Sequence, residues 1–183
     1  MSNPWLNACK MEAVCNYADA IILYLNDASE CLKNGLLVRA GLSCSCAADC
    51  LVKLRDGTLQ KKLYFMAATV YRENANSSSD RSIREWLWSL QKAYENFLLA
   101  GETSMATAVH SEYLFLEKKV HPFTHEVESL APKSDSISSA IPAALNVLPE
   151  SVIKAVKIFF EQETVSLKYR SKTATGSRNG CEK

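Results

Sequence analysis

Hydrophobic residues recur at alternating spacings of three and four along most of the chain, which is the period of one face of an α-helix. The first such run covers residues 11–32 and stops before Asn34 and Gly35, a pair suited to a left-handed helix ending. It comprises Met11, Val14, Ala18, Ile21, Leu25, Ala28 and Leu32. This run predicts one long helix with a single apolar stripe.

Further segments keep the same spacing and are separated by turn residues. We expect helices over residues 36–54, 58–73, 80–100, 103–130 (interrupted at Pro122) and 150–169. Thr58 and Asp80 are suited to begin two of them, because their side-chain oxygens can accept hydrogen bonds from free backbone N–H groups. The stretch "NANSSS" (74–79) predicts a polar loop.

The fold class follows from this pattern. No stretch alternates apolar and polar residues for long enough to predict a strand, so we expect an all-α protein. Short connections favour antiparallel helical hairpins, arranged as a bundle or a short stack of about six helices. The expected organisation is a helical domain (1–130), a Ser/Pro linker (131–148), a C-terminal helix packing on the domain (149–170) and a disordered basic tail (171–183).

Composition and charge narrow the class of protein. The chain has 183 residues, of which 48% are hydrophobic and 22% charged, which is ordinary for a globular domain. A net charge of +1 gives no general attraction to nucleic acid or to an anionic membrane. The first residues lack a signal-peptide pattern, and no apolar run reaches the roughly 20 residues of a membrane span. We therefore expect an intracellular protein, cytoplasmic, nuclear or both, with reduced cysteines and no cofactor.

The segment "DRSIREWLWSLQKAYENF" (80–97) contains two tryptophans that one helix cannot present to the same side. Its apolar stripe is formed by Ile83, Leu87, Leu90, Tyr94 and Phe97. Trp86 flanks this stripe and is expected in the core. Trp88 lies about 150° from the centre of the stripe, among polar and charged residues.

Two interpretations of Trp88 are open. A neighbouring helix, or the aliphatic stems of basic residues, could cover the ring. Alternatively, Trp88 anchors a contact with another protein, because Trp and Arg are enriched among the residues that dominate interface energetics. The interface hypothesis consists of Trp88, Arg84, Lys92 and Leu99.

The segments "LYFMAATVY" (63–71) and "EWLWSLQKAYENF" (85–97) carry a further pattern. The first supplies Leu63 or Tyr64, then Met66, Ala67 and Tyr71, and the second supplies Leu90 and Ala93. In this order the pair resembles a tetratricopeptide-type helical hairpin, and the Ala-, Tyr- and Leu-rich helices are also similar to microtubule-interacting-and-transport domains. The "NANSSS" insertion and Trp86 depart from the tetratricopeptide pattern, and no second copy follows at its period of about 34 residues. The resemblance, confined to residues 63–97, implies peptide or protein binding between helices rather than catalysis.

The cysteines and histidines offer an alternative chemistry. Cys46 and Cys50 share a helix face, whereas Cys44 points nearly opposite to Cys46. Together with His121 and His125, Cys46 and Cys50 would complete a tetrahedral zinc site. Two other interpretations are that the small residues of "GLSCSCAADC" (41–50) allow two helices to approach closely, or that one thiol is reactive.

These patterns favour a non-catalytic adaptor or scaffold subunit that binds a peptide or helix of another protein. The alternative is a zinc-binding or thiol-dependent protein. The sequence contains no phosphate-binding loop and no H-E-x-x-H motif, and no basic stripe predicts nucleic-acid binding. The helix over residues 11–32 has more apolar surface than one neighbour needs, which predicts either central burial or self-association. His110 is expected at the surface without a partner.

Overall fold

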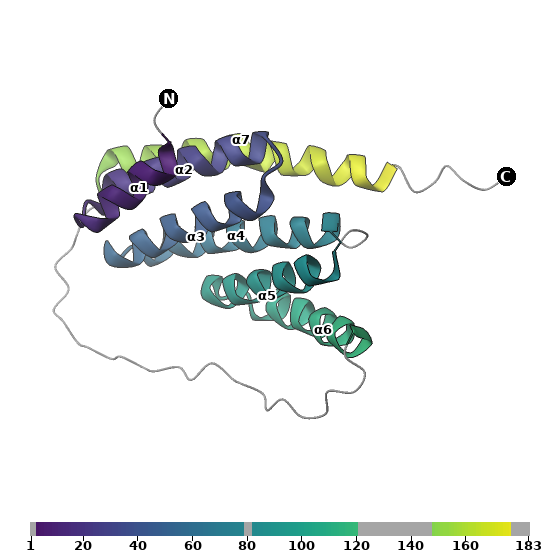
Figure 1. Cartoon of the computed structure of the whole chain (residues 1–183). Coiled ribbons are helices and arrows are strands. Elements are labelled where there is room, and N and C mark those ends of the chain that lie inside the picture. Colours follow the sequence, from purple (N-terminus) through teal and green to yellow (C-terminus); the bar gives the residue numbers. More distant parts are fainter. Residues whose placement is uncertain (1–2, 79–81, 121–147, 177–183) are drawn as a thin grey trace, which may run out of the picture.

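The fold is described by a computed structural model covering residues 3–78, 82–120 and 148–176, with the backbone alone for residues 164–176. Within these ranges every element of regular secondary structure is an α-helix, which confirms the predicted all-α class (Figure 1). The helices are α1 (Pro4–Ala13), α2 (Tyr17–Lys33), α3 (Leu37–Lys53), α4 (Gly57–Ser78), α5 (Ile83–Ala100), α6 (Thr103–Val120) and α7 (Glu150–Gly176).

Helices α2 to α6 form a stack in chain order, with successive helices running in alternating directions (Figure 1). Helix α1 packs on α2, and α7 returns to pack on α2 as well. The three neighbours of α2 account for its wide apolar surface, as expected for a helix buried centrally. None of the described helices is long and apolar enough to cross a membrane.

The predicted helix over residues 11–32 is wrong at its beginning, because the chain turns between α1 and α2. Cys15 adopts a left-handed conformation with φ of 59°, and the Asn16 side chain accepts a hydrogen bond from the Asp19 backbone N–H. The new helix α1 begins after Asn3, whose side chain caps it, with Pro4 in its first turn. Apolar spacing runs unbroken across the turn, so periodicity alone could not reveal it.

The predicted "NANSSS" loop is also wrong over most of its length, since α4 continues to Ser78. Asn74 is buried and donates hydrogen bonds to Ser89 Oγ (2.8 Å) and Glu85 Oε1 (3.2 Å) on α5. Asn74 and Ser78 at this end of α4 are therefore buried, whereas Asn76 and Ser77 face solvent. Asn74 is one of the buried polar groups that join α4 to α5.

Two helix starts differ from the predicted caps by a few residues. Asp56, rather than Thr58, begins α4, because its Oδ1 accepts hydrogen bonds from the backbone N–H groups of Thr58 (3.1 Å) and Leu59 (2.8 Å). Ser82 caps α5 by accepting from the Glu85 N–H, whereas Asp80 lies outside the described residues. The predicted left-handed ending of α5 is confirmed, with φ of +84° at Gly101.

At the C-terminal end, α7 extends to Gly176 and includes residues 171–176, which the sequence had placed in a disordered tail. The linker prediction falls mostly on residues 121–147, which lie outside the described part of the chain. Val152, Val156 and Phe159 are buried, so the first half of α7 belongs to the core. Glu163 is buried too, and its Oε1 accepts a 2.6 Å hydrogen bond from Ser29 of α2.

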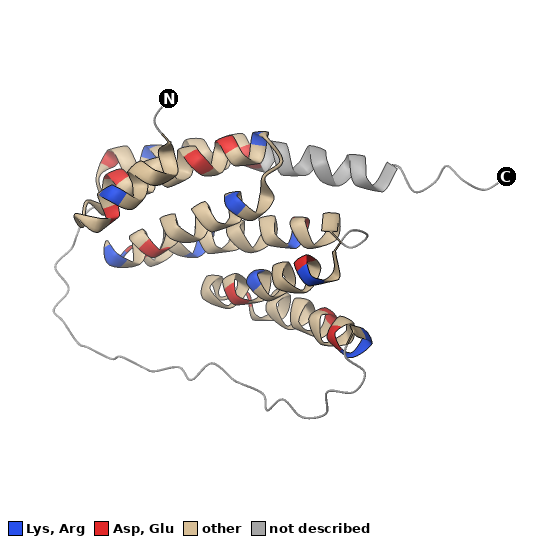
Figure 2. Cartoon of the chain, viewed as in Figure 1, with Lys and Arg blue, Asp and Glu red and all other residues tan. Residues whose placement is uncertain are grey.

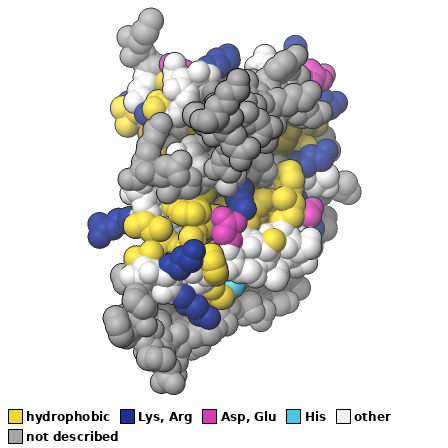
Figure 3. Space-filling view, turned by 90° about the vertical axis from the view of Figure 1, so that its right-hand side faces the viewer, with side chains coloured by type: hydrophobic (Ala, Val, Ile, Leu, Met, Phe, Trp, Pro, Cys, Tyr) yellow, Lys and Arg dark blue, Asp and Glu magenta, His cyan; other side chains and the backbone are white. Residues whose placement is uncertain are grey.

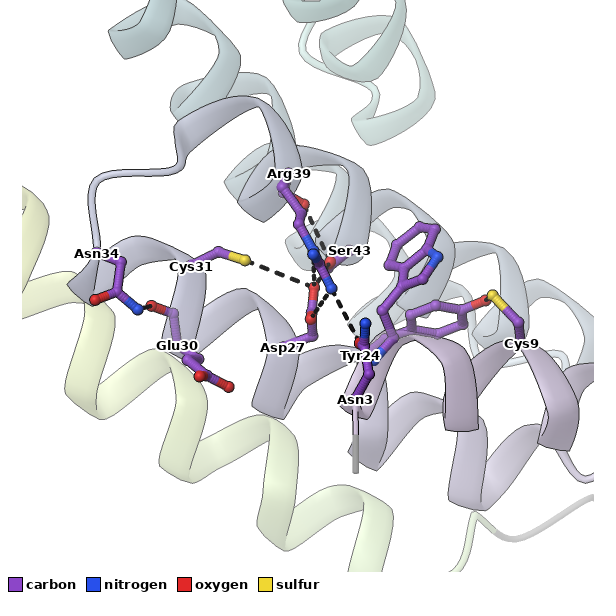
Figure 4. A network of polar contacts seen from close by, with 10 residues as sticks. Asn3, Cys9, Tyr24, Asp27, Glu30, Cys31, Asn34, Arg39 and Ser43 are labelled. Carbon is purple, nitrogen blue, oxygen red and sulfur yellow. Dashed lines mark hydrogen bonds and ion pairs between the residues drawn. The ribbon is translucent and has the colours of Figure 1, made fainter. Parts of the chain in front are cut away.

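A buried carboxylate joins α2 to α3 (Figure 4). Asp27 is 2% exposed and accepts hydrogen bonds from the Arg39 guanidinium (2.7 and 3.2 Å) and from Ser43 Oγ (2.6 Å). Arg39 also donates to the side chain of Asn3 and lies over the Trp5 ring at 5.9 Å. This network therefore links the start of α1 to both α2 and α3.

Helix α3 approaches α4 closely at Gly41. A Cβ atom added to Gly41 would lie 2.9 Å from Cζ of Tyr71, a distance that real side chains do not tolerate. Gly41 is therefore the residue that allows the buried Tyr71 ring to rest directly on the α3 backbone.

We predict that Gly41→Ala lowers the free energy of unfolding by about 1–3 kcal/mol, because the added methyl group overpacks the contact with Tyr71. Gly57→Ala is the matched control, since a Cβ there would meet no heavy atom within 4 Å. Urea unfolding of both variants checks this. Equal stability of the two variants would contradict the proposed close approach.

We also predict that Arg39→Met lowers the free energy of unfolding by about 1–3 kcal/mol, because it leaves a buried carboxylate with fewer donors. Lys92→Met removes an ion pair of the same 2.7 Å length, from Lys92 to Glu95, in which the carboxylate side chain is 40% exposed rather than 3%. That control should lose less than about 0.5 kcal/mol. If Lys92→Met lowers the free energy of unfolding as much as Arg39→Met does, the burial of Asp27 does not explain the loss.

Candidate functional site

The four residues of the interface hypothesis lie together on the outer side of α5. Arg84, Trp88, Lys92 and Leu99 fall within about 80° of one another around the helix axis. Leu99 is 52% exposed and Trp88 is 39% exposed. We call this set the α5 stripe.

Trp88 is held from one side only. Its ring meets the Tyr71 ring of α4 edge-on, with centroids 5.6 Å apart and planes at 82°. Tyr71 is buried and rests on Gly41, so the partner of Trp88 is itself fixed. A neighbouring helix therefore supports the ring, while more than a third of Trp88 stays accessible.

Charge along the α5 stripe is mixed. Lys92 pairs with Glu95 at 2.7 Å, and Glu95 also accepts a hydrogen bond from Gln91. Arg84 is exposed and forms no ion pair with any described residue. The Arg84 guanidinium, one helical turn before Trp88, is therefore available to a binding partner.

Charges of both signs also alternate over the rest of the described helices. Figure 2 shows basic and acidic positions interspersed along the described helices. Figure 3 shows the end of the molecule at which α5 begins, where exposed hydrophobic side chains lie between charged ones.

The buried side of α5 is turned relative to the predicted stripe. The buried residues are Ser89, Leu90, Ala93, Asn96, Phe97 and Ala100, which centre on Ala93. Ile83, expected in the core, is 41% exposed in the first turn. Trp86 is half-buried and packs against the core, and its buried Nε1 has no hydrogen-bond partner among the described residues. The turn arises because α5 contacts α4 on one side and α6 on another, and Asn96 Oδ1 accepts a hydrogen bond from Ser45 Oγ of α3 (2.9 Å).

The proposed zinc ligands are not brought together by the described part of the structure. No group of three or more potential ligands capable of holding a metal ion occurs among the described residues, and His121 and His125 lie outside them. Cys44 and Cys50 are buried between helices, and Cys46 is partly buried. The close-packing interpretation of "GLSCSCAADC" agrees with this burial.

The thiols of α3 are also poor nucleophiles. Burial, reinforced by nearby acidic groups, raises the pKa of Cys46 and of Cys50 to about 12, and burial raises the pKa of Cys44 as well. A thiol must lose its proton to attack an electrophile or bind a metal ion. At neutral pH these three therefore remain protonated.

Two features of the surface were not identified from the sequence. His110 on α6 stacks on Tyr94 of α5, with ring centroids 4.7 Å apart, and lies parallel to Tyr113. Its expected lack of a partner is therefore wrong, because sequence spacing within α6 carries no information on the register between α5 and α6.

The second feature is a groove of about 690 Å³ between α4, the α5–α6 corner and α7. It is lined by Leu59, Lys61, Lys62, Phe65, Ala100, Glu102, Val156, Lys157, Phe160 and Glu161. The feature of the sequence that relates to this groove is the apolar stripe of the last helix. The position of that helix against α4 could not be deduced from the sequence.

We predict that a thiol-alkylating reagent at pH 8 modifies Cys15, which is exposed, long before Cys46 or Cys50. With a pKa of about 12, only about one Cys46 thiol in ten thousand is ionised at that pH. Mass spectrometry of peptides after timed labelling measures the order, and labelling in denaturant provides the fully reactive control. Rapid native modification of Cys46 or Cys50 would restore the thiol-dependent alternative.

Comparison with protein-family models, curated proteins and solved structures found no match to this chain.

Proposed function

We propose that this chain is a non-catalytic protein–protein interaction module, an adaptor or scaffold subunit, that binds a partner through the α5 stripe. The observation that carries the proposal is Trp88, a large aromatic ring that is fixed at one edge by Tyr71 and 39% exposed. Aromatic side chains and arginine dominate the energetics of protein interfaces. Arg84 lies one helical turn before Trp88, and Leu99 adds an exposed aliphatic side chain three turns after it.

The free energy gained by covering Trp88 is large enough for this residue to anchor a partner. Covering the exposed part of a tryptophan removes about 100 Å² of mostly apolar surface from water, worth about 2–3 kcal/mol. Because Tyr71 already restrains the ring, little rotamer entropy is lost when a partner covers it. Covering Leu99, which is 52% exposed, adds to the same patch.

The partner that fits this surface is a peptide or helix with an apolar pocket or face for Trp88 and a carboxylate for Arg84. We place this interaction inside the cell, in the cytoplasm or nucleus, and without a cofactor. The tetratricopeptide-like pattern of residues 63–97 points to the same class of activity. The raised pKa values of Cys46 and Cys50 disfavour a reactive thiolate at either position, which argues against the thiol-dependent alternative.

We predict that Trp88→Ala lowers the recovery of partners in proximity labelling while costing only about 1–2 kcal/mol of stability, because it removes the exposed anchor and one edge contact. Trp86→Ala should cost about 3 kcal/mol, because that ring packs against the core. Thermal melting separates the two effects.

Phe115→Ala is the matched control for surface exposure, since that ring is 59% exposed on α6. Its partner recovery should equal that of the wild type. If recovery is unchanged for Trp88→Ala, or falls equally for Phe115→Ala, the α5 stripe is not the binding surface.

A further inference from the structure

We propose that the groove between α4 and α7 is a second binding site, for an amphipathic helix of a partner protein whose apolar face is flanked by acidic residues. Its lining includes Ala100 at the end of α5 but none of the residues of the α5 stripe, so the two sites can be tested separately. We call it the α4/α7 groove.

The base of the α4/α7 groove is apolar and well supported. Val156 and Ala100 are buried beneath it, at 1% and 7% exposure. Phe65 is 39% exposed into it while its ring edge meets the buried Phe97 at 5.8 Å. An exposed aromatic ring backed by a core residue has a fixed position, which limits the entropy lost on binding.

The dimensions fit apolar side chains from one helix. A volume of about 690 Å³ is typical of sites that take up a large part of a ligand. Two of its walls are helices, α4 and α7, and an amphipathic helix inserts side chains at positions i, i+3 or i+4, and i+7 into such grooves. The packing of α7 on α2 already uses this spacing, through Val152, Val156 and Phe159.

The charges decide the chemistry of the partner. The α4 wall contributes Lys61 and Lys62 and no acidic residue, and the α7 wall contributes Lys157. These three lysines are exposed and form no ion pair with any described residue. The acidic residues of the lining, Glu102 and Glu161, lie at the α5–α6 corner and on α7. A helix lying against α4 is therefore complemented by acidic flanking residues.

The test is a selection from a phage library of helical peptides, run on the full chain. Each peptide carries leucines at i, i+3, i+4 and i+7, and its flanking positions are varied among acidic, basic and neutral residues. We expect enrichment of peptides with Asp or Glu in the flanks. The selected peptide should bind about tenfold more weakly to the double variant Lys61→Glu, Lys62→Glu, as expected for two reversed charges at a partly exposed site.

Selection on that double variant should instead favour basic flanks, which a mere loss of folding could not produce. Trp88→Ala is the control and should leave peptide affinity unchanged. If Trp88→Ala leaves partner recovery in cells unchanged, the proposal for the α5 stripe fails, but the peptide selection on the α4/α7 groove is unaffected. The two proposals are therefore tested separately.

Enrichment without a charge bias, affinity unchanged by the lysine reversal, or binding lost in Trp88→Ala would each overturn the proposal. A parallel selection on Phe65→Ala, shown by its melting curve to be folded, is the second reference. If no peptide is enriched more strongly on the wild type than on this variant, the proposal is also overturned. Concentration-dependent sedimentation that disappears in Phe65→Ala would assign the groove to a second copy of the chain, against this proposal.

Discussion

The contact between Tyr71 and Gly41 is the constraint on which the rest of the structure depends. It brings α4 onto the backbone of α3, and the same Tyr71 ring then meets Trp88 of α5. A side chain at position 41 would push α4 away and remove the support for the tryptophan. One buried aromatic residue therefore connects the packing of three consecutive helices with the surface that we propose to be functional. The Gly41–Tyr71 contact therefore contributes both to the packing of α3 on α4 and to the position of Trp88 on the proposed binding surface.

Polar groups determine how the remaining helices are aligned. Asp27 holds α3 against α2 through Arg39 and Ser43, and Glu163 fixes α7 on α2 through Ser29. Buried polar groups need partners, so each of these contacts favours one alignment of its two helices over the alternatives. Helix α7 in turn forms a wall of the α4/α7 groove. The position of α7, set partly by a single buried glutamate, thus shapes a site lined by residues far apart in sequence.

The sequence predicts helices wherever apolar spacing is regular, and it places the left-handed ending at Gly101 correctly because that depends on local chemistry. It fails at Cys15 because the apolar spacing runs unbroken across the turn, and in "NANSSS" because that segment is held by α5. Asn74 stays helical since Ser89 and Glu85 receive its hydrogen bonds, and neither partner is visible in the local pattern. The register between helices is equally hidden, which is why the stacking of His110 on Tyr94 and the α4/α7 groove emerge only from the structure.

The central claim is that the outer face of α5 is covered by a partner protein. Site-specific photocrosslinking in cells tests it most directly, with p-benzoylphenylalanine placed at Leu99 on the α5 stripe or at Val14, which is 69% exposed on a different part of the surface. The account predicts a discrete covalent adduct to another protein from position 99 and none from position 14. An adduct from position 14 alone, or none from position 99, would contradict it.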